Sequence, residues 1–279
     1  MTRTARTTQA RSTRRTLRAR TLRPRSRRTR IVAASAVVVA LVATATACGA
    51  DAGDDKDPDH RSFALQGRTL TIDSDDSALD LVVADSAAAD KVEVTRWFKG
   101  HVVVGGDPRA TWSMKDDRLV LRMKCSGVVS DCAARHRIEV PRGVAVTVKD
   151  SDGRVTAQGF KEALAIRTSD GAVRVTESSG PLDLVTDDGS VTALGVGSRR
   201  VKANTQDGSV RLELGVVPDL VESRSKDGSI TIGLPHDTYR VTTETGDGAV
   251  RVSVPRNDSS SHVVSARTDD GKVTVRTAN

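Results

Sequence analysis

Short alternation of apolar and polar residues runs through most of the chain, and no long stretch shows the period of an amphipathic helix. In one representative segment, Val173 and Val175 flank Arg174, and Leu182 and Leu184 follow a short polar turn. Because successive side chains of a strand point to opposite faces, the aliphatic residues of such a segment share one face. The pattern predicts an all-β protein built from pairs of short strands, each pair with one buried face.

An Asp-Gly pair recurs seven times in the second half of the chain, at intervals of 18, 18, 19, 20, 20 and 23 residues. Such spacing is typical of a stacked repeat unit. Glycine suits a turn with positive φ, and aspartate can bond its own backbone, so the pairs are predicted to be structural turns. They are Asp152 and Gly153, Asp170 and Gly171, Asp188 and Gly189, Asp207 and Gly208, Asp227 and Gly228, Asp247 and Gly248, and Asp270 and Gly271.

The near-constant interval favours a β-solenoid of about seven repeats of 18–23 residues, with two short strands in each rung. Ordering one repeat costs roughly 1–2 kcal/mol per residue. Burying each of its four aliphatic side chains returns only about 1.5–3 kcal/mol, so several repeats must stack. Asp-Gly is also a strong hairpin signal, and an antiparallel barrel or sandwich of hairpins is the alternative.

Four segments follow from composition: an Arg-rich arm and signal segment at 1–47, an acidic disordered tether at 48–60, an irregular β capping region at 61–140, and the solenoid at 141–279. The capping region holds four of the six aromatic residues and would cover the apolar end of the first repeat. Only four residues follow Val275, which predicts an open edge at the C-terminal strand and possible self-association there.

Residues 1–30 contain twelve arginines and no acid. Without them, 31 basic residues (43 minus 12) face 36 acidic ones, a net charge of −5, and nothing favours nucleic-acid binding. The uncharged segment from Ile31 to Ala47 follows the arm. This order is typical of a secretory signal: a basic flank comes first, then an apolar stretch, then a cleavage site of small residues. The positive arm of such a signal stays in the cytoplasm.

The small residues before Cys48 resemble the lipobox of bacterial lipoproteins, and the whole leader resembles those of actinobacterial lipoproteins. The resemblance implies cleavage before Cys48, acylation of the new N-terminus, and attachment to the outer face of the cytoplasmic membrane. Ordinary cleavage after Ala47 and an uncleaved anchor are the alternatives.

Cys125 and Cys132 remain once Cys48 is set aside, with six residues between them. In an exported chain a short-loop disulfide is the expected pairing. A metal or redox pair is the weaker alternative, because the spacing is not Cys-x-x-Cys.

No catalytic, cofactor-binding or metal-binding residue is predicted. The histidines share no ligand spacing and are expected at the surface; they are His60, His101, His136, His236 and His262. Two alternatives stay open. Calcium could lie between stacked aspartates, helped by a column of hydroxyl residues that includes Thr168 and Thr186. A carbohydrate-active enzyme could combine the aspartates with Arg167, Arg174 or Arg251, although the repeats offer few aromatic platforms.

The repeats Thr186–Val191 and Thr205–Val210, together with the lead-in Ile138–Pro141, resemble the DUF4097 "putative adhesin" family over residues 61–279. The resemblance implies the solenoid fold and suspected adhesion, and it brings no catalytic residues. The chain is therefore interpreted as a non-catalytic interaction or scaffold module at the cell surface. Its expected partners are the membrane, through Cys48, and envelope polymers or another protein.

Overall fold

The structure is a computed structural model that describes residues 52–84 and 90–278. The chain divides into two units, Met1–Thr46 and Ala47–Asn279. The Arg-rich arm, the signal segment and Cys48 lie outside the described residues, so the predictions made for them stay predictions. The hydrophobic core of the described residues runs from Phe63 to Val275 and belongs entirely to the second unit.

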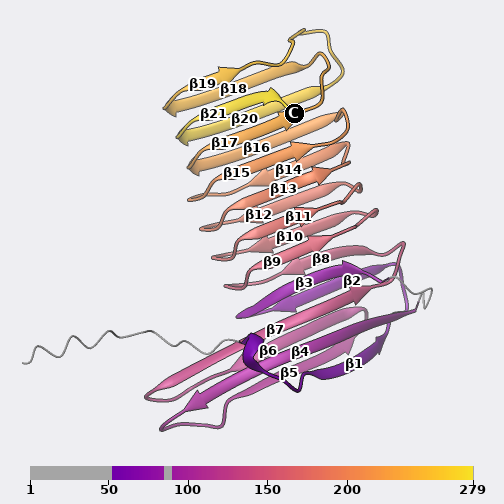
Figure 1. Ribbon diagram of the computed structural model, residues 1–279, viewed down its shortest axis with the longest axis vertical. Coiled ribbons are helices and arrows are strands. Elements are labelled where there is room, and N and C mark those ends of the chain that lie inside the picture. The colour runs from indigo at the N-terminus through magenta and orange to yellow at the C-terminus, as the bar shows by residue number, and fades with distance from the viewer. Residues whose placement is uncertain (1–51, 85–89, 279) are drawn as a thin grey trace, which may run out of the picture. The chain divides into compact units, whose positions relative to one another are not determined.

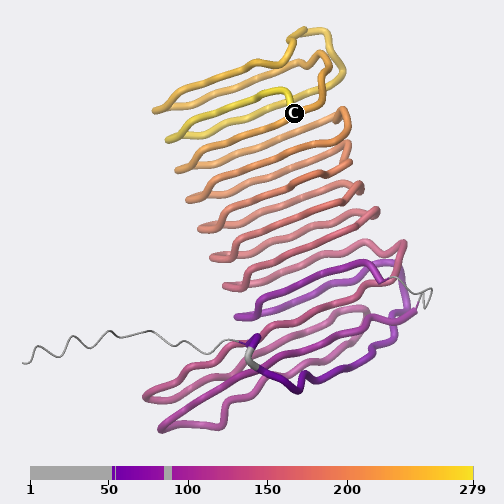
Figure 2. Tube along the Cα trace, viewed as in Figure 1, coloured from indigo at the N-terminus to yellow at the C-terminus, as the bar shows by residue number. Residues whose placement is uncertain are grey.

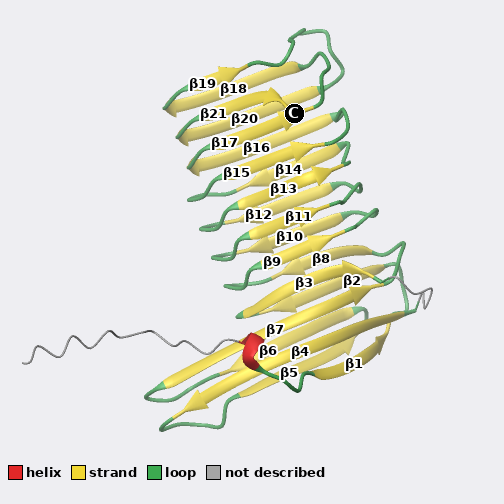
Figure 3. Ribbon diagram, in the orientation of Figure 1, coloured by secondary structure: helices red, strands yellow, loops and turns green. Residues whose placement is uncertain are grey.

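Two sheets face each other in the second unit (Figure 1, Figure 3). Their alternating aliphatic side chains are buried between them. Across sheet A the eleven strands are, in order, β1 (Asp59–Ala64), β4 (Lys91–Val102), β7 (Ser130–Val140), β3 (Ser77–Val83), β9 (Val155–Gln158), β11 (Val173–Thr176), β13 (Val191–Val196), β15 (Val210–Leu214), β17 (Ile230–Leu234), β21 (Val273–Thr277) and β19 (Val250–Val252). Across sheet B the ten strands are β18 (Arg240–Asp247), β20 (Val263–Asp270), β16 (Leu220–Asp227), β14 (Arg200–Asn204), β12 (Leu182–Thr186), β10 (Leu164–Thr168), β8 (Ala145–Lys149), β2 (Thr69–Ser74), β6 (Arg118–Lys124) and β5 (Arg109–Lys115).

Each rung of the stack consists of one strand of sheet B, a turn, and one strand of sheet A. Neighbouring rungs pair in parallel, with Leu164 opposite Leu182 in sheet B and Val173 opposite Val191 in sheet A. The fourteen strands β8 to β21, taken two to a rung, give seven rungs after residue 141, as the Asp-Gly count predicts. Because the pairing is parallel and both sheets are open, the solenoid is confirmed and the hairpin alternative is excluded.

The last rung in the chain is not the last rung of the stack. Strands β20 and β21 lie between the rung of β16 and β17 and the rung of β18 and β19, as the colours of Figure 2 show. Val275 is opposite Ile232 on one side and Val252 on the other. The predicted open edge at the final strand is therefore wrong, because β21 is paired on both sides; β18 and β19 form the edges at this end.

The segment that returns the chain past β18 and β19 packs on Tyr239. The Tyr239 amide donates to Pro255 O at 3.0 Å, and the Asn257 amide donates to Tyr239 O at 2.9 Å. The Tyr239 hydroxyl donates to Pro235 O at 2.9 Å, and its side chain is fully buried. The lengthened last interval of the sequence thus corresponds to a crossing segment.

The N-terminal end also departs from chain order. The rung of β2 and β3 lies between the rung of β6 and β7 and that of β8 and β9, and it pairs in parallel with both. Residues 61–140 are therefore not simply an irregular cap, because they contain two regular rungs. The antiparallel pairs of this region are β1 with β4, β4 with β7, and β5 with β6, and β1, β4 and β5 cover the apolar end of the stack.

The predicted tether is shorter than expected, because residues 52–60 are part of the fold. A short 3-10 helix, η1 (Ala52–Asp54), precedes β1, and Ala52 is buried. Asp55 Oδ2 accepts a hydrogen bond from the Phe98 amide at 3.0 Å, and Asp59 pairs with Arg96 at 2.6 Å. The acidic composition predicted a tether, but two of these acids have partners in the cap. No helix among the described residues is both long and apolar enough to cross a membrane.

Candidate interaction surfaces

The Asp-Gly turns stack into one column, which we call the turn edge. A Cβ added to Gly189 would lie 2.1 Å from Gly171 O of the preceding rung, and one added to Gly208 would lie 2.1 Å from Gly189 O. Positive φ occurs at only two of the seven glycines, Gly248 (156°) and Gly271 (152°). The predicted reason for glycine is thus wrong for most turns: close approach of the neighbouring backbone requires it.

A column of hydroxyl groups lies just inside the turn edge. Thr186 Oγ1 donates to Gly171 O at 3.0 Å and accepts the Gly189 amide at 3.1 Å, so it joins two rungs. Thr205 repeats the contact on Gly189 O at 2.9 Å. The same position is occupied by Thr168, Ser225, Thr245 and Thr268. These hydroxyls satisfy buried backbone groups, which explains their recurrence without any ligand.

The aspartates of the turn edge are exposed to solvent, and three of them have a raised pKa. The pKa of Asp170 is raised by a hydrogen bond shared with Asp152. The pKa of Asp207 is raised in the same way, by a hydrogen bond shared with Asp227. Desolvation and the nearby charges of Asp227 and Asp247 raise the pKa of Asp270. A row of carboxylates at rung spacing therefore carries mutual repulsion that water and salt must relieve.

The calcium alternative finds no ligand set in the described turns. Among residues 52–84 and 90–278, no group of three or more His, Cys, Asp or Glu side chains is arranged to hold a metal ion. The carboxylates are spread along the stack rather than gathered around one point. The arginines proposed for an enzyme are also apart: Arg167 lies on sheet B, whereas Arg174 and Arg251 lie on sheet A.

Asp150 occupies the place in the first Asp-Gly rung where later rungs have threonine. Its Oδ2 accepts the Gly153 amide at 2.7 Å, as Thr186 accepts that of Gly189. Burial raises the pKa of Asp150 to about 7, against the lowering effect of the nearby Ser74 hydroxyl. Although Ser74 Oγ is close enough to exert that effect, neither it nor Asp150 Oδ1 has a partner in hydrogen-bonding geometry.

His136 contradicts the expectation that every histidine lies at the surface. It is 1% exposed, between the sheets in the cap, with its ring 6.3 Å from that of Trp112. Burial and the charge of Arg96 lower its pKa to about 4. In β7, His136 alternates with the outward-facing Arg135 and Arg137. This alternation indicates an inward-facing residue, which the absence of metal-ligand spacing could not reveal.

A groove of about 680 Å³ crosses the outward face of sheet B, which we call the sheet B groove. Small side chains such as Ala145, Thr147 and Ala165 form its floor, because they are the outward residues of β8 and β10. Its rim carries both charge signs and includes Asp183, Arg200, Lys202 and Asp219. Some of these charges pair across rungs, with Arg167 to Asp183 at 2.7 Å and Lys202 to Glu222 at 3.3 Å.

A second cleft, of about 630 Å³, lies where β7 leads into the repeats. Charged residues line it, among them Arg137, Glu139, Lys161 and Glu177. Phe160 is also in its lining, and its side chain is 1% exposed. A ring so buried offers no stacking platform for a sugar.

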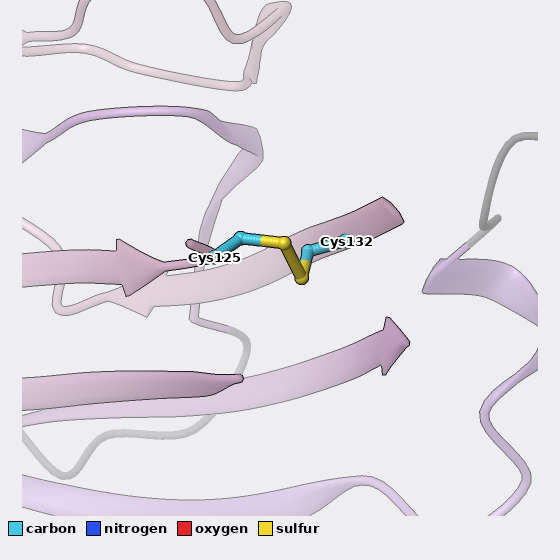
Figure 4. The surroundings of a disulfide bond; sticks show 2 residues. All are labelled: Cys125 and Cys132. Carbon is cyan, nitrogen blue, oxygen red and sulfur yellow. A yellow bond between two sulfur atoms is a disulfide. The ribbon is translucent and has the colours of Figure 1, made fainter. Parts of the chain in front are cut away.

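The ends of β4 and β7 continue past the stack as a two-stranded projection, which we call the valine finger (residues 103–106 and 126–129). The Val103 amide donates to Val129 O at 3.0 Å, and the Val128 amide donates to Val104 O at 2.8 Å. The predicted disulfide between Cys125 and Cys132 is present and closes the base of this projection (Figure 4).

The sequence model of one protein family, described as Toastrack DUF4097, matches residues 135–276. The chain belongs to this family. The match begins in β7 and ends in β21, so it covers the seven Asp-Gly rungs and leaves out β1 to β6. The Toastrack match is thus narrower than the resemblance over residues 61–279 that the sequence suggests.

Three solved structures resemble the chain at low identity. A "putative adhesin" from Parabacteroides merdae has a TM-score of 0.45 at 13% identity, covering 79% of this chain and 96% of its own. A "putative adhesin" from Bacteroides fragilis has a TM-score of 0.46 at 12% identity, covering 79% of this chain and 98% of its own. A "putative cell adhesion protein" from Clostridium sporogenes has a TM-score of 0.32 at 13% identity, covering 80% of this chain and 100% of its own. No curated protein matches the chain. Likenesses of this degree say nothing about what this Toastrack protein binds.

Proposed function

We propose that the chain is an exported, lipid-anchored interaction module without catalytic activity, which binds an envelope polymer or a protein through the sheet B groove. The observation that carries the proposal is the groove itself, which has small side chains from β8 and β10 on its floor and charges of both signs along its rim. Such a surface admits an extended ligand and can repeat the same weak contact from rung to rung, which adds affinity through effective concentration.

The experiment is a pull-down from isolated cell envelope with the chain from Ala52 to Asn279, which contains the whole described core. The variant R200E/K202E reverses two rim charges and should lose most of the captured material, because both residues line the groove. The matched control R174E/R211E reverses two charges on the outward face of sheet A and should capture as the unchanged chain does.

Equal capture by both variants would reject the groove as the binding surface. Release of soluble product from the envelope would instead favour the carbohydrate-active alternative. The anchor is tested separately in the full chain, where the unchanged protein should incorporate a labelled fatty acid and C48S should not.

A further inference from the structure

The valine finger exposes the largest group of apolar side chains on the described surface. Val103 and Val104 are each 61% exposed, Val128 is 82% exposed and Val129 is 57% exposed. The only other large hydrophobic residues exposed in the described part are Val216 and Val250, which stand singly. Four adjacent valines at the tip of a projection therefore call for an explanation that scattered surface valines do not.

Close backbone packing and a disulfide brace the finger. A Cβ on Gly105 would lie 2.2 Å from Ser126 O, and one on Gly127 would lie 2.4 Å from Val102 Cγ1, so the two strands meet closely at their glycines. The disulfide joins Cys125 to Cys132 directly below the tip. A braced apolar tip does not have to be ordered when it binds, which lowers the entropic cost of inserting it.

Charges of both signs surround the base of the tip. Lys99, Arg109 and Lys124 are exposed there. Asp107 and Asp131 lie beside them, and the charge of Lys99 also acts on Asp55, so the three basic and three acidic residues leave no net charge. The four apolar side chains beyond this mixed-charge base are the part of the finger that favours the interface of a bilayer.

The point where the chain enters the fold fixes which surface the tip can reach. Asp55, just after η1, accepts a hydrogen bond from Phe98 of β4, the strand that carries Val103 and Val104. From Phe98 to Val104 is six residues of extended chain, or roughly 20 Å. Three residues separate the expected anchor Cys48 from Ala52, and the four Cα–Cα steps between the two span at most about 14 Å.

We propose that the valine finger inserts into the surface of a lipid bilayer and gives the protein a second, non-covalent membrane contact beside its anchor. The inference rests on the proposed lipid anchoring for its geometry, since a tether this short keeps the cap near the membrane.

The test uses the chain from Ala52 to Asn279, without any lipid, and vesicles of phosphatidylcholine mixed with phosphatidylglycerol. The unchanged chain should sediment with the vesicles. V103S/V104S/V128S/V129S should bind roughly tenfold or more weakly, because it removes the apolar area available for transfer. The matched control V216S/V250S, at the two isolated valines, should bind as the unchanged chain does.

V128W keeps the test decisive if the fourfold variant folds poorly, since tryptophan favours the interface and should strengthen vesicle binding. The proposal is overturned if the unchanged chain ignores vesicles, if the fourfold variant binds equally well, or if V128W has no effect. It is also overturned if sedimentation velocity shows a dimer that the fourfold variant dissociates while vesicles are not bound, because a second copy would then cover the tip. Because no anchor is present, these outcomes are independent of the C48S experiment.

Discussion

Glycine and threonine at the turn edge have structural roles that differ from those that their residue types predict from the sequence. The Asp-Gly pair predicted a turn correctly, but glycine is required at most rungs because a carbonyl of the neighbouring rung lies where a Cβ would be. That reason could not be found from one repeat, since the carbonyl belongs to another. Thr186 likewise serves the rung before it, which a local pattern cannot reveal.

G189A should destabilise the fold by on the order of 3 kcal/mol, because its Cβ would overlap a backbone atom that cannot move without shifting a rung. G215A is the matched control. Its Cβ would meet nothing nearer than Val196 O at 3.8 Å, and its melting temperature should be nearly unchanged. Urea denaturation of both variants measures the difference, and equal losses would show that close approach is not the constraint at the turn edge.

Asp150 should make stability depend on pH. Its folded pKa of about 7 lies above the usual 3.8, so the folded state holds the proton more tightly. The stabilising effect of that proton is complete below about pH 4 and is lost as pH rises to about 7. D150T places the hydroxyl of the other rungs there, and its stability advantage should grow by about 1.4 kcal/mol per pH unit across this window.

Titration of His136 changes stability with pH in the opposite direction to that of Asp150. Comparing variants at Asp150 therefore tests the assignment better than the pH curve of the unchanged chain does. The pKa of His136 is lowered to about 4, so stability is lost as pH falls from about 6.5. Over much of the same window the two groups offset each other. D150N removes the titration without adding a threonine and should show the same slope as D150T; a difference that stays constant with pH would contradict the assignment to Asp150.

At the level of elements, the sequence identified strands and their buried faces but not the order in which rungs stack. Val173 and Val175 are buried as alternation requires, whereas Val250 is 45% exposed. Every rung has the same pattern, so no alternation distinguishes a middle rung from an end rung. The only sequence signal of the reordering was the lengthened last interval, which reads equally well as a surface loop.

The disulfide should stabilise the valine finger without holding the repeats together. Closing a loop of this length contributes about 2.5 kcal/mol in the chain-entropy account. In C125S/C132S, the amides of Val103 and Val128 should therefore exchange with deuterium roughly tenfold or more faster, since their hydrogen bonds lie just above the bridge. Ile166, in the middle of the stack, should exchange as before. Faster exchange throughout sheet B would mean that the bridge supports the whole fold.

At the level of the whole molecule, parallel rungs share one interior in the described residues. The rung of β18 and β19, taken out of chain order, covers one end, and the antiparallel strands β1, β4 and β5 cover the other. The repeat period predicted the stack, because a rung cannot bury its aliphatic side chains alone. The ends were predicted less well, since they depend on which strand covers an exposed apolar face. Tyr239 at one end and the antiparallel strands β4 and β5 at the other illustrate solutions that no repeat pattern contains.

Methyl contacts across the C-terminal rungs test this account most directly. With Ile and Val methyl groups labelled, nuclear Overhauser effects should connect Val275 to Ile232 and also to Val252, because β21 lies between β17 and β19. Ile232 and Val252 are two rungs apart, about 10 Å, and should show no strong direct contact. A strong effect between Ile232 and Val252, with none from Val275 to Ile232, would show rungs stacked in chain order and would contradict the structure described.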